Sequence, residues 1–501
     1  MSLRLWRDLV RYAPGQFVPI VVATLSMAIF TRLATPEAFG TFVLVSALAT
    51  TVSAPFGQWL MQGVLRFYPG AARDGREAEL VQSVSILSLA FAAVVALLVL
   101  VLLLVGFGGQ DLQLGDLLPA GLLTFFSVAA TAPQAAMVAQ FASARYSAMN
   151  VLSALLKLAL PMVLFGVLGP VAALLWGSAA AAILVWAVLT FAQLRRSWRV
   201  RVRLGEVYRI SRDALGFGMP LAVSEIGVQT LAYSDRYVIS LLLGAAAVGL
   251  YSSNYSIAEK LLILVQAPLI FAAHPQIVSN WEHGDHADTQ RMIRNATRWL
   301  LVLGIPLVAF TVVRGEMVSA LLLGEAFLPG HVVIPIVATS ILIYAASQYG
   351  HKSFELSKDT WVITVSLISA AVANIVAVVV LTLRFGYIGG AYATVFGYAA
   401  YAGVTYVISR RRGPFRWDIP WRSGLNAAVA ALAAAVVWWL VMPERLSSVT
   451  SAVGIGLSGL LGLGLYAALL VVLGELPPPQ NLSRGILRRW SWNDANVRNS
   501  G

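Results

Sequence analysis

The chain has 501 residues, of which 59% are hydrophobic and only 12% are charged. Soluble globular proteins are about 45–50% apolar and about 25% charged, so this composition excludes a soluble fold, a disordered chain and a collagen-like chain. The sequence has no cysteine, which excludes disulfides, thiol chemistry and Cys-based metal sites. A net charge of +12 raises the question of a nucleic-acid partner, and the positions of the charges decide it.

Apolar segments long enough to cross a bilayer recur along the chain. A membrane-spanning helix needs about 20 mainly apolar residues. This criterion predicts fourteen helices, near residues 14–33, 38–62, 80–106, 117–143, 147–168, 170–193, 213–243, 247–277, 298–313, 331–350, 360–383, 387–409, 424–441 and 449–474. We therefore expect an all-α polytopic integral membrane protein.

The basic residues between these segments lie almost entirely on one side of the predicted membrane. Connections on that side hold 28 of the 35 Lys and Arg residues, and connections on the other side hold 4. The remaining three, Lys157, Arg236 and Lys260, fall inside predicted helices. Because cytoplasmic loops are enriched in Lys and Arg, this distribution predicts that both termini are cytoplasmic. Topology accounts for the positive charge, so we expect no nucleic-acid partner.

The connections are too short to hold a catalytic domain. The longest are about 18–20 residues, and the longest on the outer side, near 314–330, offers only Arg314, Glu316 and Glu325 as charged groups. No GxSxG, Walker A or HExxH motif is present. We expect no catalytic residues, no cofactor and no metal site, so the helices themselves carry the function.

Two glycine-containing stretches recur at similar spacing along the chain. Residues 29–42 resemble 238–251 at an offset of 209, and residues 164–172 resemble 384–392 at an offset of 220. These matches predict two six-helix lobes of the same orientation, which is typical of transporters that work by alternating access. The predicted domains are an N-terminal lobe (1–212), a C-terminal lobe (213–412), helices 13 and 14 (413–476) and a cytoplasmic tail (477–501).

Polar residues at membrane depth form stripes on several predicted helices. Charged residues there are costly, by about 2.5–3.5 kcal/mol each on insertion scales, and are functional candidates by default. Segment 213–243 places Glu225, Gln229 and Arg236 on one face, next to Asp235. Other stripes lie in the segments 117–143, 147–168, 247–277 and 331–350. Since such stripes must face protein or water, we predict a central hydrated cavity shared by both lobes.

The charged and polar residues of these stripes are the candidate site. Basic groups in a cavity suit an anionic substrate such as a phosphate. The candidates for substrate binding are Lys157, Lys260, Arg236, Gln229, Asn150 and Tyr255. The candidates for coupling transport to protons or sodium are Glu225, Glu259 and Asp235.

A purely structural interpretation of these charges is the alternative. Glu259 would then pair with Lys260 or Arg236, and Glu225 with Lys157, as buried contacts between helices. Asp235 and Arg236 lie near the outer end of their predicted helix, where an interfacial or capping role is as good an explanation as substrate contact.

Four stretches carry a family resemblance. They are TRLATPEAFG at 31–40, GQWLMQGVLRFYP at 57–69, SDRYVISLLLGAAAVGLYSSNYSIAEK at 234–260 and RFGYIGGAYAT at 384–394. In this order they resemble the O-antigen and exopolysaccharide flippases of the multidrug/oligosaccharidyl-lipid/polysaccharide exporter superfamily. The resemblance runs from about residue 10 to 475, and Asp235 and Arg236 match the family's Asp-Arg pair.

The resemblance implies two six-helix lobes around a central cavity, with two extra C-terminal helices, in the bacterial inner membrane. It implies flipping of undecaprenyl-pyrophosphate-linked oligosaccharides toward the periplasm. The implied partners are this lipid carrier, membrane lipids and a polysaccharide polymerase or assembly proteins. We therefore predict a non-enzymatic flippase.

Three rival functions remain. Two belong to the same superfamily, a multidrug or cation antiporter and a flippase for the peptidoglycan precursor. The third is a membrane glycosyltransferase or polymerase, which the short outer loops disfavour.

Overall fold

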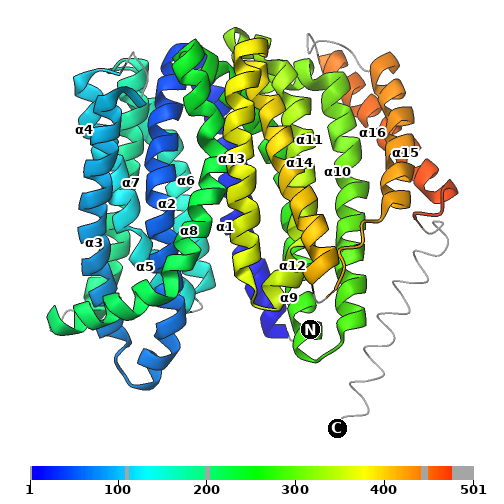
Figure 1. Ribbon diagram of the computed structural model, residues 1–501. Coiled ribbons are helices and arrows are strands. Elements are labelled where there is room, and N and C mark those ends of the chain that lie inside the picture. The colour runs from blue at the N-terminus through cyan, green and yellow to red at the C-terminus, as the bar shows by residue number, and fades with distance from the viewer. Residues whose placement is uncertain are drawn as a thin grey trace.

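The computed structural model describes residues 3–107, 112–140, 142–197, 204–413, 415–441 and 449–476 of the chain. Within these ranges the chain is helical throughout and contains no strand. The long helices run side by side from one end of the bundle to the other (Figure 1). Eleven of them are long and apolar enough to cross a membrane. The predicted all-α membrane architecture is confirmed.

The first half of the bundle consists of seven α-helices. They are α1 (Leu3–Leu33), α2 (Pro36–Arg73), α3 (Glu77–Leu102), α4 (Leu114–Ala129), α5 (Thr131–Ala139), α6 (Ser143–Phe165) and α7 (Pro170–Ser197), with a short π-helix, η1 (Leu103–Phe107), after α3. The segment predicted as one helix over 117–143 is divided at Ala130. Pro133 explains the break, because proline cannot donate a hydrogen bond to the carbonyl four residues before it.

The second half repeats this order, and two more helices follow. Its elements are α8 (Leu204–Leu243), α9 (Ala245–Glu282), α10 (His286–Leu322), the 3-10 helix η2 (Glu325–Val332), α11 (Val333–Gly350), α12 (Lys352–Leu356), α13 (Thr360–Phe385) and α14 (Tyr387–Arg412). The last two helices are α15 (Trp421–Val441) and α16 (Val449–Val472). The domain boundaries stay predictions: residue 212 falls inside α8, and the tail 477–501 lies outside the described residues.

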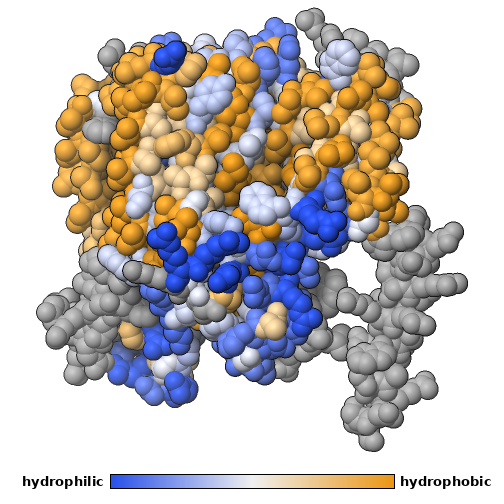
Figure 2. All heavy atoms as spheres, turned by 45° about the vertical axis from the view of Figure 1, so that its right-hand side comes forward, coloured by the Kyte–Doolittle hydropathy of each residue, from blue (hydrophilic) through white to orange (hydrophobic). Residues whose placement is uncertain are grey.

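The two ends of the bundle differ in charge. Arg66, Arg73 and Arg76 lie where α2 ends and α3 begins, and we name this end of the bundle the basic end. In Figure 2, apolar side chains cover the upper part of the visible face, and hydrophilic side chains gather toward its lower part. This pattern fits a band in contact with lipid and an end in contact with water.

The two copies of the first repeat meet at the end opposite the basic end. A Cβ atom on Gly40 would lie 1.9 Å from the carbonyl oxygen of Ala245, and one on Gly249 would lie 1.9 Å from that of Pro36. Only glycine allows this approach of α2 and α9. The repeated glycines therefore exist because the two halves pack backbone against backbone.

Hydrogen bonds join the two halves beside these glycines. The guanidinium of Arg32 donates to the carbonyl of Leu321 at 2.9 Å. The amide of Gly324 donates to the hydroxyl of Thr31 at 3.1 Å. We name the set formed by Gly40, Gly249 and these hydrogen bonds the interhalf contact.

Helices α15 and α16 pack against α10 of the second half. Arg314 is buried and donates to the carbonyl of Trp438 at 2.6 Å and to that of Trp439 at 3.0 Å, at the end of α15. The sequence placed Arg314 in an outer loop; in the structure α10 is kinked at Arg314, where the backbone leaves helical geometry, and helix resumes after it as far as Leu322. The guanidinium satisfies carbonyls that have no partner inside α15, which holds α15 on the bundle.

Candidate central cavity

A cavity of about 780 Å³ lies between the two halves of the bundle. Its walls come from α2, α4, α5, α6 and α7 of the first half and from α8, α9, α11 and α14 of the second. A cavity shared by both halves was predicted from the polar stripes, and the structure contains one.

The predicted site residues divide into two groups by their relation to this cavity. Lys157, Arg236, Tyr255 and Glu259 line it. The other candidates, which are not among its lining residues, are Asn150, Glu225, Gln229, Asp235 and Lys260. Each half therefore brings a cation to the cavity, Lys157 from α6 and Arg236 from α8.

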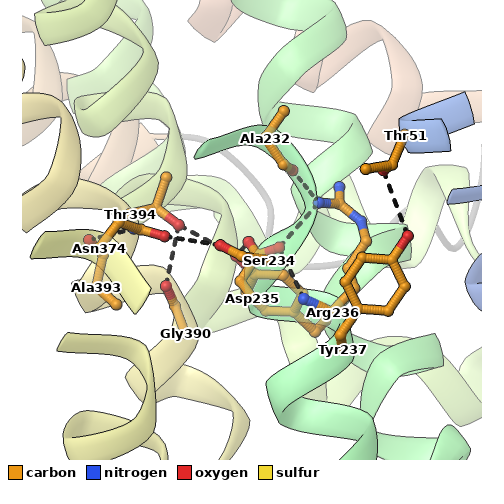
Figure 3. Close-up of polar contacts among 11 residues, drawn as sticks. Thr51, Ala232, Ser234, Asp235, Arg236, Tyr237, Asn374, Gly390, Ala393 and Thr394 are labelled. Carbon is orange, nitrogen blue, oxygen red and sulfur yellow. Dashed lines mark hydrogen bonds and ion pairs between the residues drawn. The ribbon is translucent and has the colours of Figure 1, made fainter. Parts of the chain in front are cut away.

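Arg236 is held in place by a buried network (Figure 3). Its guanidinium lies 3.1 Å from Oδ1 of Asp235 and also donates to the carbonyl of Ala232. The hydroxyl of Tyr251 donates to the second carboxylate oxygen of Asp235. Asp235 and Arg236 are only 1% and 5% exposed. They form part of the protein interior rather than an interfacial cap.

Two aromatic rings complete the surroundings of the Arg236 guanidinium. Its Cζ lies 4.8 Å from the ring centre of Tyr233 and 4.6 Å from that of Tyr255. Both distances are within the range of cation–π attraction. With one carboxylate and two rings around it, Arg236 has little charge left to offer a substrate.

The same part of α8 is joined to its neighbours by uncharged hydrogen bonds. Ser234 donates to the side-chain oxygen of Asn374 at 2.9 Å, and the Asn374 amide donates to the carbonyl of Ala393 at 2.9 Å. On the opposite side, Tyr237 and Thr51 share a hydrogen bond of 3.3 Å between α8 and α2 (Figure 3). Arg236 therefore sits on a firmly positioned wall.

Lys157 and Glu259 differ from Arg236 because neither has a polar partner in the described part of the chain. Both line the cavity, and both are exposed to it. No ion pair within 4 Å joins Glu259 to Lys260 or Arg236, or Glu225 to Lys157, among the described residues. In this part of the chain, the cavity thus presents an ammonium group and a carboxylate that form no hydrogen bond or ion pair.

The remaining candidates have other positions. Gln229 donates to the Glu225 carboxylate at 2.6 Å on the same helix. Asn150 donates to the carbonyl of Gly15 on α1 at 3.4 Å. Lys260 follows Glu259 on α9 without being a lining residue. Their predicted roles stay predictions.

Much of the polar lining was not identified from the sequence. The residues missed include Ser46, Thr50 and Ser53 on α2 and Tyr398 on α14. The three α2 residues are spaced by four and three, so the helical period could have revealed them. A small hydroxyl side chain costs much less to insert into a membrane than a charged one. Its presence in a helix therefore does not by itself mark the residue as functional.

No group of three or more His, Cys, Asp or Glu residues that could hold a metal ion occurs among the described residues. Nearly half of the residues that line the cavity carry a hydroxyl or an amide. Such a surface can form many hydrogen bonds to an uncharged polar ligand and a single strong one, from Lys157, to an anion.

The sequence and the fold both have relatives among known proteins. A family model described as polysaccharide biosynthesis protein matches residues 29–332, and no curated protein matches the chain. The fold is similar to that of the lipid II flippase MurJ in an inward closed conformation, with a TM-score of 0.73, 12% identity, and 92% of this chain and 98% of that chain covered.

Transporters of the MOP superfamily share the fold as well. An inward-facing multidrug resistance MATE family transporter matches with a TM-score of 0.63 at 15% identity, covering 81% of this chain and 98% of that chain. A MOP superfamily transporter from Pyrococcus furiosus matches with a TM-score of 0.59 at 15% identity, with 81% and 95% covered. Because the family model spans more than half of its length, this chain belongs to the polysaccharide biosynthesis protein family.

Proposed function

We propose that this protein is a flippase that moves an undecaprenyl-pyrophosphate-linked oligosaccharide from the cytoplasmic to the periplasmic leaflet of the inner membrane. It carries out no covalent chemistry on its substrate. The observation that supports this proposal most is the cavity lining, in which one unpaired lysine lies among hydroxyl, amide and tyrosine side chains. This combination suits a ligand that is part glycan and part phosphate.

The two parts of the substrate headgroup have different needs. Sugars offer many hydroxyl groups, which hydrogen-bond to serine, threonine, glutamine and tyrosine. A pyrophosphate needs a cation, and charge-assisted hydrogen bonds to it are the strong ones. Lys157 is the lining cation that has no partner among the described residues, whereas Arg236 is already held by Asp235. We therefore assign the pyrophosphate to Lys157 and the glycan to the polar wall around Arg236.

The prenyl tail would remain in lipid, next to α15 and α16. The apolar surfaces of these helices include Leu432, Val436, Leu460 and Leu461, which are all more than half exposed in the structure. A tail there would leave only the headgroup to cross the polar cavity, which avoids exposing hydrocarbon to water.

Transport requires the two halves to move relative to each other. The interhalf contact joins them at the end opposite the basic end, and we place the basic end in the cytoplasm. Opening this contact would release the substrate toward the periplasm. Glu259, Glu225 and Asp235 are the candidates for coupling the motion to an ion, and Glu259 is the one that lines the cavity.

A reconstitution experiment tests the proposal. The purified protein is placed in vesicles whose membrane contains fluorescent undecaprenyl-pyrophosphate-linked oligosaccharide, and a membrane-impermeant enzyme reports which glycans have crossed. We expect flipping by the wild type, its loss in Lys157→Ala, and a smaller loss in Lys260→Ala, because Lys260 is not a lining residue of the cavity. Arg411→Ala, an exposed arginine at the end of α14, is the control and should keep full activity. Full activity in both lysine variants would overturn the site assignment, and export of a cationic dye without glycan flipping would favour the antiporter.

A further inference from the structure

A second pocket, of about 590 Å³, lies at the basic end of the first half, away from the central cavity. It is formed where α2, α5 and α7 end and where α3 and α6 begin. Its polar lining residues are Tyr68, Glu77, Gln140, Arg145 and Gln193. None of these residues lines the central cavity, so the proposed transport site does not account for this pocket.

Two of these lining residues each carry a buried polar atom that has no partner. The Oε2 atom of Glu77 and the Nε2 atom of Gln193 are buried and have no hydrogen bond. A buried donor or acceptor without a partner has lost its hydration without gaining a hydrogen bond, so two such residues on the wall of one pocket favour a polar ligand there.

The charges in the pocket are opposite but not joined. Glu77 and Arg145 both line it, and the described residues include no ion pair between them. Glu77 is the first residue of α3. A ligand that carries both a cation and an anion could contact both residues at once.

The equivalent place in the second half is filled by the chain itself. With the offset of 209 between the halves, the end of α2 corresponds to the end of α9, where the ring of Trp281 lies 5.9 Å from that of Phe415. Gln290 of α10 donates to the carbonyl of Arg416 at 3.3 Å. Trp417 packs so closely on Gly350 that a Cβ atom there would lie 2.5 Å from its ring. The fold therefore forms a notch at the basic end of each half, and residues 415–417 fill only the second.

We propose that the pocket of the first half binds the headgroup of phosphatidylethanolamine. The primary ammonium group donates to the Glu77 carboxylate, and the phosphate accepts from Arg145 and from the Gln193 amide. We place the pocket at the level of the phospholipid headgroups, because the membrane segments predicted from the sequence begin or end close to it. A choline headgroup has no N–H to donate to Glu77, and a glycerol headgroup has no cation, so the pocket distinguishes among the common phospholipids.

Native mass spectrometry of the purified full-length protein tests this proposal. The protein is titrated separately with the dioleoyl forms of phosphatidylethanolamine, phosphatidylcholine and phosphatidylglycerol. We expect the ethanolamine lipid to bind about tenfold more tightly than the other two. Glu77→Gln should remove this preference with little change in shape. Arg145→Ala should weaken the ethanolamine and choline lipids alike, because both carry the phosphate.

Glu79→Gln is the matched control, because Glu79 lies on the same turn of α3 but pairs with Arg76 at 2.7 Å and does not line the pocket. It should keep the lipid preference. An unchanged preference in Glu77→Gln, at an unchanged thermal unfolding midpoint, would overturn the proposal. Soluble glycerophosphoethanolamine is the last probe. If it displaced the lipid at equal affinity, the ligand would be a soluble compound and the assignment to a lipid would be wrong.

Discussion

The two halves of the bundle share a framework but treat their polar groups differently. In the second half, the cation of the cavity wall is paired within the protein, since Arg236 is held by Asp235 and lies against the rings of Tyr233 and Tyr255. Among the charged residues of that wall, only Glu259 has no ion pair in the described chain. In the first half, Lys157 faces the cavity without a partner in the described chain. The same contrast recurs at the basic end, where residues 415–417 fill the notch of the second half and the notch of the first half is a pocket lined by Glu77.

This difference indicates that paired side chains stabilise the fold and unpaired ones bind ligands. A side chain that is paired inside the protein stabilises one arrangement and is costly to disturb. A polar side chain left unpaired in a cavity stabilises nothing by itself but can bind a ligand with its full charge. We therefore expect substitutions in the paired wall around Arg236 to affect stability first, and substitutions at the unpaired lining residue Lys157 to affect binding first.

The largest effect is expected for Asp235→Ala. This change leaves the guanidinium of Arg236 buried without its carboxylate, and breaking a buried pair by removing one partner costs about 3–5 kcal/mol. Unfolding of the purified protein in detergent, followed by tryptophan fluorescence, measures it. The double variant Asp235→Ala/Arg236→Met removes both charges and should recover much of the loss. If the double variant were as unstable as the single one, the loss would come from packing rather than from the unpaired charge.

A somewhat smaller loss is expected for Trp417→Ala. The side chain is only 3% exposed and fills the notch of the second half, and truncating a buried tryptophan costs about 3–5 kcal/mol, with values at the low end where neighbours can move inward. Tyr68→Ala, at the pocket of the first half, is the comparison. Tyr68 is only partly buried where it packs against the core of the first half, so its loss should be smaller, about 1–2 kcal/mol. Equal losses in the two variants would contradict the contrast between a filled notch and a pocket.

Lys157→Met is expected to separate binding from stability. The change removes a charge that no described residue neutralises, so the unfolding free energy should change by no more than about 0.5 kcal/mol. Flipping of the lipid-linked oligosaccharide should fall at least about tenfold, because a hydrogen bond to a charged group contributes about 1.5–3 kcal/mol. Parallel unfolding and vesicle measurements decide the matter. A large loss of stability in this variant would show that Lys157 is a structural residue.

The sequence predicts the helices well and the environments of their charged residues poorly. Long apolar segments and repeated glycines are local patterns, so the helix order and the two matching halves follow from them directly. Whether a charged residue is paired depends on which helices meet. Arg236 pairs with Asp235 rather than with Glu259 because of how α8 packs against α9, where the hydroxyl of Tyr251 also binds Asp235. The spacing of residues along the sequence does not predict this choice. The same holds for Lys260, which shares its helix with Glu259 but not its contact with the cavity.

The ends of helices were the other source of error. Arg314 was predicted to lie in an outer loop because the apolar run stops there; α10 does leave helical geometry at Arg314, but helix resumes to Leu322 and the arginine is buried. Its position makes sense only with α15 in place, since its partners are the carbonyls of Trp438 and Trp439. A residue whose partner lies more than 120 positions away in the chain cannot be placed by a hydropathy window.

The smallest expected effect concerns Glu475, which joins the segment after α16 to the second half. Burial alone would raise the pKa of the Glu475 carboxyl, but hydrogen bonds from Arg298, at 2.7 Å, and from Asn426, at 3.0 Å, hold this pKa below its ordinary value of 4.5. A lowered pKa means that the folded state favours the ionised carboxylate. The stabilisation is therefore fully present above pH 4.5 and is lost as the pH falls through the lowered pKa. Because Arg298 is partly exposed, we expect less than about 1 kcal/mol.

Unfolding midpoints of the wild type and of Glu475→Gln, measured over a range of acidic pH values, check this prediction. The wild type should be slightly more stable than the variant above pH 4.5, and the two curves should converge as the carboxylate becomes protonated. Glu282→Gln, at the exposed end of α9, is the control and should follow the wild-type curve. A constant difference between wild type and Glu475→Gln at every pH would mean that the glutamate acts by its shape alone. The ion pair would then contribute nothing to the attachment of α16. Charge pairing would stabilise the second half only in the buried wall around Arg236.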